Sequence, residues 1–194
     1  MTAHPEPGTR RAAAAAKTRD ALIDAGFRLA EDTPLKKLSA NVVVAAAEVS
    51  KGTFFHHFPT RADYLVALHD SFHDRLEAEI LETIGAMEPG ADRLIAGSIT
   101  YLDVCVRDRS VRALLAEARA EPDVTASVQR RSERSAELCV VDFERLAVTH
   151  PVESARLWVR LVSETALLEA AAGGPVPTLR AALAEFVPRP DRTA

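Results

Sequence analysis

Residues 39–61 read SANVVVAAAEVSKGTFFHHFPTR, and this stretch decides the fold. It predicts two short helices, over about 40–47 and about 51–58, joined by a tight turn at 48–49. The second helix opens on Ser-Lys-Gly-Thr, and small residues at a helix start let the helix approach another surface closely. Polar and basic groups at the same place suit a backbone rich in phosphate. The pattern therefore indicates a helix-turn-helix that binds DNA.

The expected helix boundaries rest on side chains that cap or break helices. Ser39 and Ser50 are good N-caps, because a serine hydroxyl accepts a hydrogen bond from a free backbone N–H of the first turn. Pro59 ends the second short helix. Thr60 and Asp63 resemble a capping box, and they predict the start of a long helix.

Outward from this stretch the whole chain is expected to be helical. It is rich in alanine, and no segment alternates as a strand does. A disordered stretch over 1–9 and a helix over about 11–31 are expected before residue 39. Glu88-Pro89-Gly90 is the clearest internal break. The further expected helices span 61–87, 91–107, 109–119, 122–149, 152–172 and 177–187.

Composition narrows the class of protein. The hydrophobic fraction of 47% supports a real core in a chain of 194 residues. The net charge is −4, but residues 1–60 carry 8 basic and 6 acidic residues while the remainder carries 16 and 22. That asymmetry suits a small DNA-binding module on a larger acidic domain. Without a long apolar run or an apolar signal segment, we expect a cytoplasmic protein with no membrane contact, in which Cys105 and Cys139 are reduced.

The chain resembles the TetR family of repressors over about residues 15–65. The resemblance rests on TRDALIDAGFRLAED at 18–32, on the helix-turn-helix with SKGTFFHHF, and on the run Phe58-Pro59-Thr60-Arg61-Ala62-Asp63-Tyr64-Leu65. It implies a DNA-binding domain over 10–60 and a ligand-binding and dimerisation domain over 61–188. It also implies a homodimeric regulator that binds a palindromic operator. A repressor that releases the operator when a small-molecule effector binds is favoured, and an activator is the alternative. No cofactor is expected, and the sequence does not identify the effector.

The DNA contacts are expected at the start of the recognition helix. Lys51 can reach guanine or phosphate, Thr53 can reach a base edge or a thymine methyl, and Gly52 leaves room for the backbone to approach DNA. The resemblance implies further contacts along the same face and at the start of the first helix. Arg10 and Arg11 are either a DNA-binding arm or a solvated end. The full expected set is Thr18, Arg19, Ser39, Asn41, Ser50, Lys51, Gly52, Thr53, Phe55, His56, His57 and Arg61.

Three positions depart from the family pattern. Phe55 stands where tyrosine is usual, so a hydroxyl that normally reaches phosphate is missing. Glu48 stands at a turn where glycine is usual, and glutamate is strained there if the backbone is left-handed. Asn41 replaces a common basic residue, which weakens one expected phosphate contact.

The remaining expected sites lie in the second domain and follow from the resemblance. An effector pocket with apolar walls and a few polar groups is expected to include Tyr101, Cys105, Leu114, Phe143 and Trp158. A dimer interface is expected on the last two long helical segments, because 152–172 is apolar on more than one face. Its expected residues are Leu157, Leu161, Leu168, Leu179, Leu183 and Phe186.

A rival reading is an all-helical metal-binding protein or enzyme that does not bind an operator. His69 and His73 are four residues apart on one helix face, a spacing that can hold a metal. The favoured alternative is a solvated helical face that happens to carry two histidines. The sequence holds no glycine-rich phosphate loop and no recognisable catalytic group, so neither a catalytic nor a metal site is expected.

Overall fold

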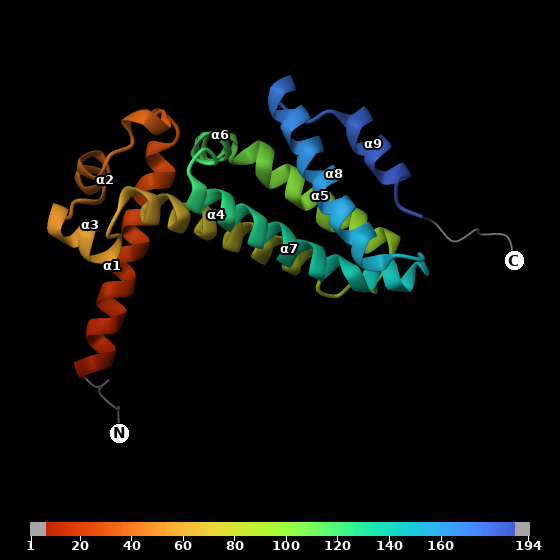
Figure 1. The fold of residues 1–194 in the computed structure, drawn as a ribbon, viewed down its shortest axis with the longest axis horizontal. Helices are drawn as coiled ribbons and strands as arrows, with labels where there is room; N and C mark the ends of the chain where they lie inside the picture. Colours follow the sequence, from red (N-terminus) through yellow and green to blue (C-terminus); the bar gives the residue numbers. More distant parts are fainter. Residues whose placement is uncertain (1–6, 189–194) are drawn as a thin grey trace, which may run out of the picture.

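The computed structural model describes residues 7–188, and within them all regular structure is helical. The all-α prediction is confirmed (Figure 1). The elements are α1 (Pro7–Leu29), the short 3-10 helix η1 (Leu35–Lys37), α2 (Ala40–Ala47), α3 (Lys51–His57), α4 (Arg61–Ile84), α5 (Ala91–Arg107), α6 (Arg109–Ala118), α7 (Pro122–Arg145), α8 (Pro151–Ala172) and α9 (Pro177–Glu185). Among these residues, no helix is both long and apolar enough to cross a bilayer.

Most helix ends lie within a few residues of the expected positions. The first helix begins at Pro7, so residues 7–9 are helical and not disordered; the rest of that expected stretch lies outside the described residues. The expected helix over 122–149 ends at Arg145, because the left-handed backbone of Ala147 (φ 54°) terminates it. The expected helix over 61–87 likewise ends early, at Ile84.

The first core joins α1, α2 and α3 to the start of α4. Phe54 and Phe58 are buried with Tyr64, whose ring centroid lies 5.2 and 5.1 Å from theirs. The Tyr64 hydroxyl donates to the carbonyl of Leu22 at 2.9 Å. A side chain on Gly26 would collide with that hydroxyl, so glycine is needed where α1 meets α4. These aromatic contacts fix α3 on α4.

The second core lies among α5, α7, α8 and α9, at the other end of the molecule (Figure 1). Glu169 of α8 is fully buried and accepts from Arg180 Nε at 2.7 Å and Nη2 at 2.9 Å. Its carboxylate also accepts from the backbone N–H of Val176 at 2.9 Å. These hydrogen bonds hold α9 against α8, and they lower the pKa of Glu169 despite its burial.

The turn between α2 and α3 carries backbone strain at Glu48. Its φ and ψ are 56° and 38°, in the left-handed region, and its N–H donates to the carbonyl of Val44. The Val49 N–H donates to the same carbonyl at 3.1 Å. Helices commonly end in this way on glycine, because a Cβ disfavours the conformation. The sequence left open whether the turn is strained or rearranged, and the structure shows the strained form.

The expectation that His69 and His73 lie on a solvated helical face is wrong. His69 is 1% exposed, and its ring centroid lies 4.4 Å from that of the half-buried His73. The physical reason is α7, which covers this face of α4 and places Ser127 Oγ 3.1 Å from His69 Nδ1. Burial lowers the pKa of His69 to about 4 and that of His73 to about 3, so both are neutral at pH 7. In the described part of the chain, no group of three or more His, Cys, Asp or Glu side chains is placed to hold a metal.

We predict that Glu48→Gly raises the free energy of unfolding by about 0.5–1 kcal/mol, because glycine adopts the left-handed turn without strain. Urea denaturation measures the change. The control is Glu137→Gly, an exposed position inside α7, where glycine should lower stability by about 1 kcal/mol. Equal destabilisation by the two substitutions would show that Glu48 is not strained.

We predict that the protein loses stability as the pH falls below the ordinary histidine pKa of 6.5. The unfolded chain then takes up protons that folded His69 and His73 cannot bind until the pH nears 4 and 3. Above pH 6.5 the neutral histidines cost no stability. At pH 5 each histidine lowers the free energy of unfolding by about 2 kcal/mol. Denaturation at pH 7 and pH 5 should show a smaller loss in His73→Gln than in wild type. Retention of the full loss in His73→Gln, as expected for the exposed control His56→Gln, would contradict this assignment.

Candidate nucleic-acid interface and interior cavity

Helix α3 presents an exposed face at one end of the molecule, away from α8 and α9 (Figure 1). Phe54 anchors the opposite side in the core, so Lys51, Gly52 and His56 are exposed. Phe55 is 43% exposed, and Lys51 Nζ lies 6.0 Å from the centroid of its ring. A helix held by one buried aromatic, with a cation and small residues at its exposed start, has the form of a recognition helix.

The two serines expected at the DNA face also cap their helices. Ser50 Oγ accepts from the Thr53 N–H at 3.1 Å and lies 2.8 Å from Thr53 Oγ1. Ser39 Oγ accepts from the Val42 N–H at 3.4 Å. Both serines are exposed, while Thr53 is half-buried and its hydroxyl is already engaged with Ser50. The Thr53 methyl group is therefore its better candidate for a base contact.

The other expected DNA residues flank α3. Arg19 is exposed on α1, and its guanidinium carbon lies 5.4 Å from the centroid of the Phe58 ring. Thr18 is half-buried, and its hydroxyl donates to the carbonyl of Ala14 at 3.0 Å. Asn41 is exposed at the start of α2, and the Arg11 side chain is exposed, whereas that of Arg10 lies outside the described residues.

His57 lies at the back of this face and is only partly exposed. Burial lowers its pKa, and the neighbouring charges of His56 and Arg19 lower it further. A neutral imidazole can accept a hydrogen bond or pack, but it does not attract phosphate by charge.

Arg61, which was also expected at the DNA face, is engaged in contacts within the chain. Its Nε donates to the carbonyl of Leu38 at 3.0 Å, and its Nη2 donates to that of Leu35 at 2.8 Å. Its Nη1 lies 3.4 Å from Glu121 Oε1, just before α7. The Leu35 carbonyl also accepts from the Leu38 N–H at 3.0 Å, so the guanidinium is a second donor to it. These contacts tie the loop before α2 to α4.

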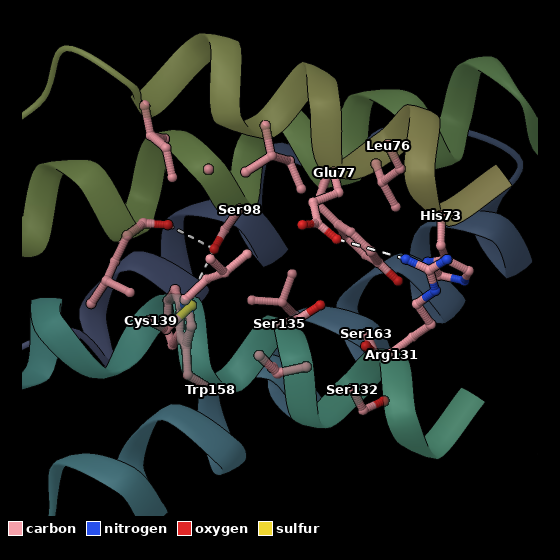
Figure 2. Close-up of a pocket in the computed structure, with 18 of the residues that line it drawn as sticks. His73, Leu76, Glu77, Ser98, Arg131, Ser132, Ser135, Cys139, Trp158 and Ser163 are labelled. Atoms are coloured by element: carbon pink, nitrogen blue, oxygen red, sulfur yellow. Dashed lines mark hydrogen bonds and ion pairs between the residues drawn. The ribbon is translucent and has the colours of Figure 1, made fainter. Parts of the chain in front are cut away.

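A cavity of about 120 Å³ lies among α4, α5, α7 and α8 (Figure 2). Its walls are largely apolar, with side chains such as Leu76, Ile80, Leu94 and Val162. One end contains Trp158, whose Nε1 donates to Ser98 Oγ at 3.1 Å. An internal cavity with apolar walls and a few polar groups is the usual form of a small-molecule site.

The other end of the cavity is polar. Figure 2 shows His73 and Arg131 close together there, with Glu77 joined to Arg131 by an ion pair of 3.7 Å. Ser132 and Ser163 lie toward the same end. Glu77 and Arg131 are paired and His73 is neutral, whereas Arg119, which also lines the cavity, forms no ion pair with the described residues.

Two of the five residues expected in the pocket line the cavity, namely Tyr101 and Trp158. Cys105 and Phe143 are buried in the second core and Leu114 in the first, so their side chains fill core space and do not line this cavity. Cys105 and Cys139 are both free. Burial raises the pKa of the Cys139 thiol, which does line the cavity, to about 12.

Most polar groups of the cavity wall were missed at the sequence level, although one signal was available. The residues of α7 that line the cavity recur every three or four positions and include several small polar side chains. They are Val128, Arg131, Ser132, Ser135, Leu138, Cys139 and Asp142. A helix face of serines among charged residues can therefore indicate a buried polar wall and not only a solvated surface.

The last two helices expose apolar side chains away from both cores. Leu157 is 71% exposed, Phe186 67% and Leu168 46%. Leu179 is partly exposed, and so is Leu161, which packs against the second core. Leu183 differs from the expectation, because it is 4% exposed and packs into the second core, where α9 lies on α8.

Comparison with known proteins agrees with this geometry. The family model described as bacterial regulatory proteins, tetR family, matches residues 22–68, which contain α2, α3 and the start of α4. No curated protein matches the chain.

Solved structures share the fold along most of the chain. A TetR-family transcriptional regulator from Rhodococcus sp. has a TM-score of 0.75 at 19% identity, over 88% of this chain and 98% of that one. A transcriptional regulator from Rhodococcus sp. RHA1 has a TM-score of 0.73 at 23% identity, over 86% and 92%. The multidrug binding protein EbrR, complexed with imidazole, has a TM-score of 0.71 at 23% identity, over 90% and 97%.

The family match falls on the segment whose caps, aromatic core and exposed α3 face form the helix-turn-helix, and the shared fold extends through the helical domain that follows. The chain belongs to the TetR family of DNA-binding transcriptional regulators.

Proposed function

We propose that this chain is a cytoplasmic, homodimeric repressor that binds a palindromic operator and releases it when a small molecule enters the interior cavity. The observation that carries the proposal is the course of α4. Tyr64 near its start packs on α3, whereas Leu76 and Ile80 in its second half line the cavity. One continuous helix therefore contacts both the DNA-reading element and the space for an effector.

In this proposal, Lys51, Gly52 and Thr53 enter the major groove at the start of α3. Lys51 binds guanine or phosphate, and the Thr53 methyl contacts a base edge. This contact is flanked by Arg19, Asn41, Phe55 and His56. Contacts to the DNA backbone fix the position of the module on the duplex.

The homodimer is supported by the apolar side chains of α8 and α9. Leu157 and Phe186 are the most exposed large apolar side chains of the described residues, and Leu168 adds to this surface. Large exposed apolar side chains gathered on adjacent helices favour association with a partner. A two-fold axis at this surface would set two α3 helices against the two halves of a palindrome.

Release follows if the effector binds more tightly to one arrangement of α4 than to the other. A ligand shifts an equilibrium only by its difference in affinity for the two states. Packing in the cavity against Leu76 and Ile80 supplies such a difference, because these side chains move with α4. EbrR, a multidrug binding protein complexed with imidazole, has the same fold, which favours a small-molecule effector here.

We predict that Lys51→Ala weakens operator binding by about tenfold or more, as expected for loss of a contact worth roughly 1–3 kcal/mol. Fluorescence anisotropy with a palindrome from the DNA flanking the coding region measures the affinity. The slope of log affinity against log salt should also become shallower. Arg145→Ala, at the end of α7, is the charge-matched control. An unchanged affinity in Lys51→Ala, or a loss as large in the control, would contradict the assigned face.

We predict that Leu157→Glu and Phe186→Glu convert the dimer to monomer at micromolar concentration, because each places a charge in an apolar interface. Light scattering after size-exclusion chromatography measures the mass. Val141→Glu is the matched control, since Val141 is 41% exposed on α7. A dimer that persists in both variants would place the interface elsewhere.

A further inference from the structure

Arg112 of α6 is a buried guanidinium whose hydrogen-bond partners are neutral. It is 9% exposed, and its Nη1 donates to the Tyr101 hydroxyl at 2.9 Å and to Cys105 Sγ at 3.0 Å. Burial raises the pKa of both Tyr101 and Cys105, so neither supplies a negative charge at pH 7. Arginine stays charged in proteins, so the positive charge of Arg112 remains uncompensated.

The other arginines with little exposure form ion pairs with carboxylates. Arg93 Nη1 lies 2.7 Å from Asp142 Oδ2, and Arg180 is paired with Glu169. Arg131 is paired with several carboxylates of α4. Among the described residues, Arg112 forms no ion pair with a carboxylate. Burying a charge without a partner costs several kcal/mol, which suggests that the partner comes from outside the chain.

A second, smaller hollow of about 20 Å³ lies beside Arg112. Its polar lining residues are His69, His73, Arg112 and Arg119, and the rest of the wall is apolar. In the described part of the chain, two buried side-chain polar atoms lack a hydrogen-bond partner, and both belong to this wall: Arg112 Nε and His69 Nε2. His73 and Arg119 line both this hollow and the large cavity, so the two spaces adjoin.

The hydrogen bonds of His69 define what the hollow must hold. Ser127 has one hydroxyl proton, which it donates to Asp70 Oδ1 at 2.6 Å. His69 Nδ1 must therefore donate to Ser127 Oγ, which leaves Nε2 as an acceptor. Arg112 Nε is a donor, so the hollow must hold both an acceptor for Arg112 and a donor for His69. A single water molecule provides both but leaves the charge of Arg112 uncompensated, and so does a carboxylic acid that keeps its proton. An ionised carboxylate accepts from Arg112 Nε and pairs with the arginines, and a water molecule beside it donates to His69 Nε2.

We propose that the effector is a small organic acid with an apolar body, whose carboxyl group is bound by Arg112 and Arg119 while its body fills the large cavity. This inference rests on the proposed function, because it names the chemical class of the effector. The body faces apolar side chains that include Leu76, Leu94 and Val162. A dry apolar cavity of about 150 Å³ is known to hold benzene, so the space suits one ring or a short chain.

Trp158 allows binding to be measured without DNA. It is the single tryptophan of the chain and it lines the large cavity, so an occupant changes its fluorescence. The probes are 3-phenylpropionate and its amide, which have the same body and differ in charge. We expect the full-length protein to bind the acid at least tenfold more tightly than the amide. Benzoate and octanoate extend the series, and 3-phenylpropylamine is the cationic control, which should not bind.

Substitutions then separate charge recognition from general packing. Arg119→Gln should weaken acid binding about tenfold and leave amide binding nearly unchanged. Arg109→Gln, an exposed position on α6, should alter neither affinity. Arg112→Met should abolish the preference for the acid and leave the melting temperature without ligand unchanged or raised, because it removes an uncompensated buried charge.

Several results would overturn the proposal. They are equal affinity for acid and amide, tighter binding of the amine, no fluorescence change with any acid, or an acid preference that survives in both Arg119→Gln and Arg112→Met. Operator binding is measured separately. Tight acid binding that leaves operator affinity unchanged would support the ligand class and contradict the release mechanism. Operator release by the amide or the amine, but not by the acids, would support the release mechanism and contradict the ligand class.

Discussion

The structure depends on one helix, α4, that takes part in two different interiors. Its first turns complete the core of the helix-turn-helix, where Tyr64 packs on Phe54 and donates to the carbonyl of Leu22. Its later turns line the cavity with His73, Leu76 and Ile80. A helix is stiff along its axis because each turn is hydrogen-bonded to the next. In the proposed mechanism, a displacement at the cavity would therefore reach α3 through this helix.

A second connection reinforces this arrangement around Arg61. The guanidinium holds the carbonyls of Leu35 and Leu38 on one side and approaches Glu121 on the other. The loop before α2 is thus attached both to α4 and to the residue that precedes α7, a helix that forms a wall of the cavity. Arg61, which the resemblance places among the DNA contacts, also joins the two halves of the chain.

The sequence predicts those features that depend on local chemistry. Serine caps, the proline after α3 and the spacing of Phe54 and Phe58 act over a few residues, so the helix-turn-helix could be placed almost to the residue. The burial of His69 could not be predicted in this way, because it depends on Ser127, 58 positions away on another helix. The polar wall of the pocket on α7 was missed for the same reason, whereas Tyr101 and Trp158 were expected there. Local pattern identifies a helix, but only packing decides which of its polar faces is turned inward.

The position of α6 indicates how charge, and not shape alone, could reach the DNA-binding element. This helix carries Arg112 toward the small hollow, while Leu114, Leu115 and Ala118 pack in the same core as α1 to α3. It also contacts η1, the turn held by Arg61. Without an occupant, a buried positive charge disfavours the close packing of α6; an anion beside Arg112 would remove that penalty and favour a tighter arrangement. The helix that carries Arg112 is thus in contact with the loop that leads into α2. Neutralisation of Arg112 would act on the helix-turn-helix through α6, and an occupant of the large cavity would act on it through α4.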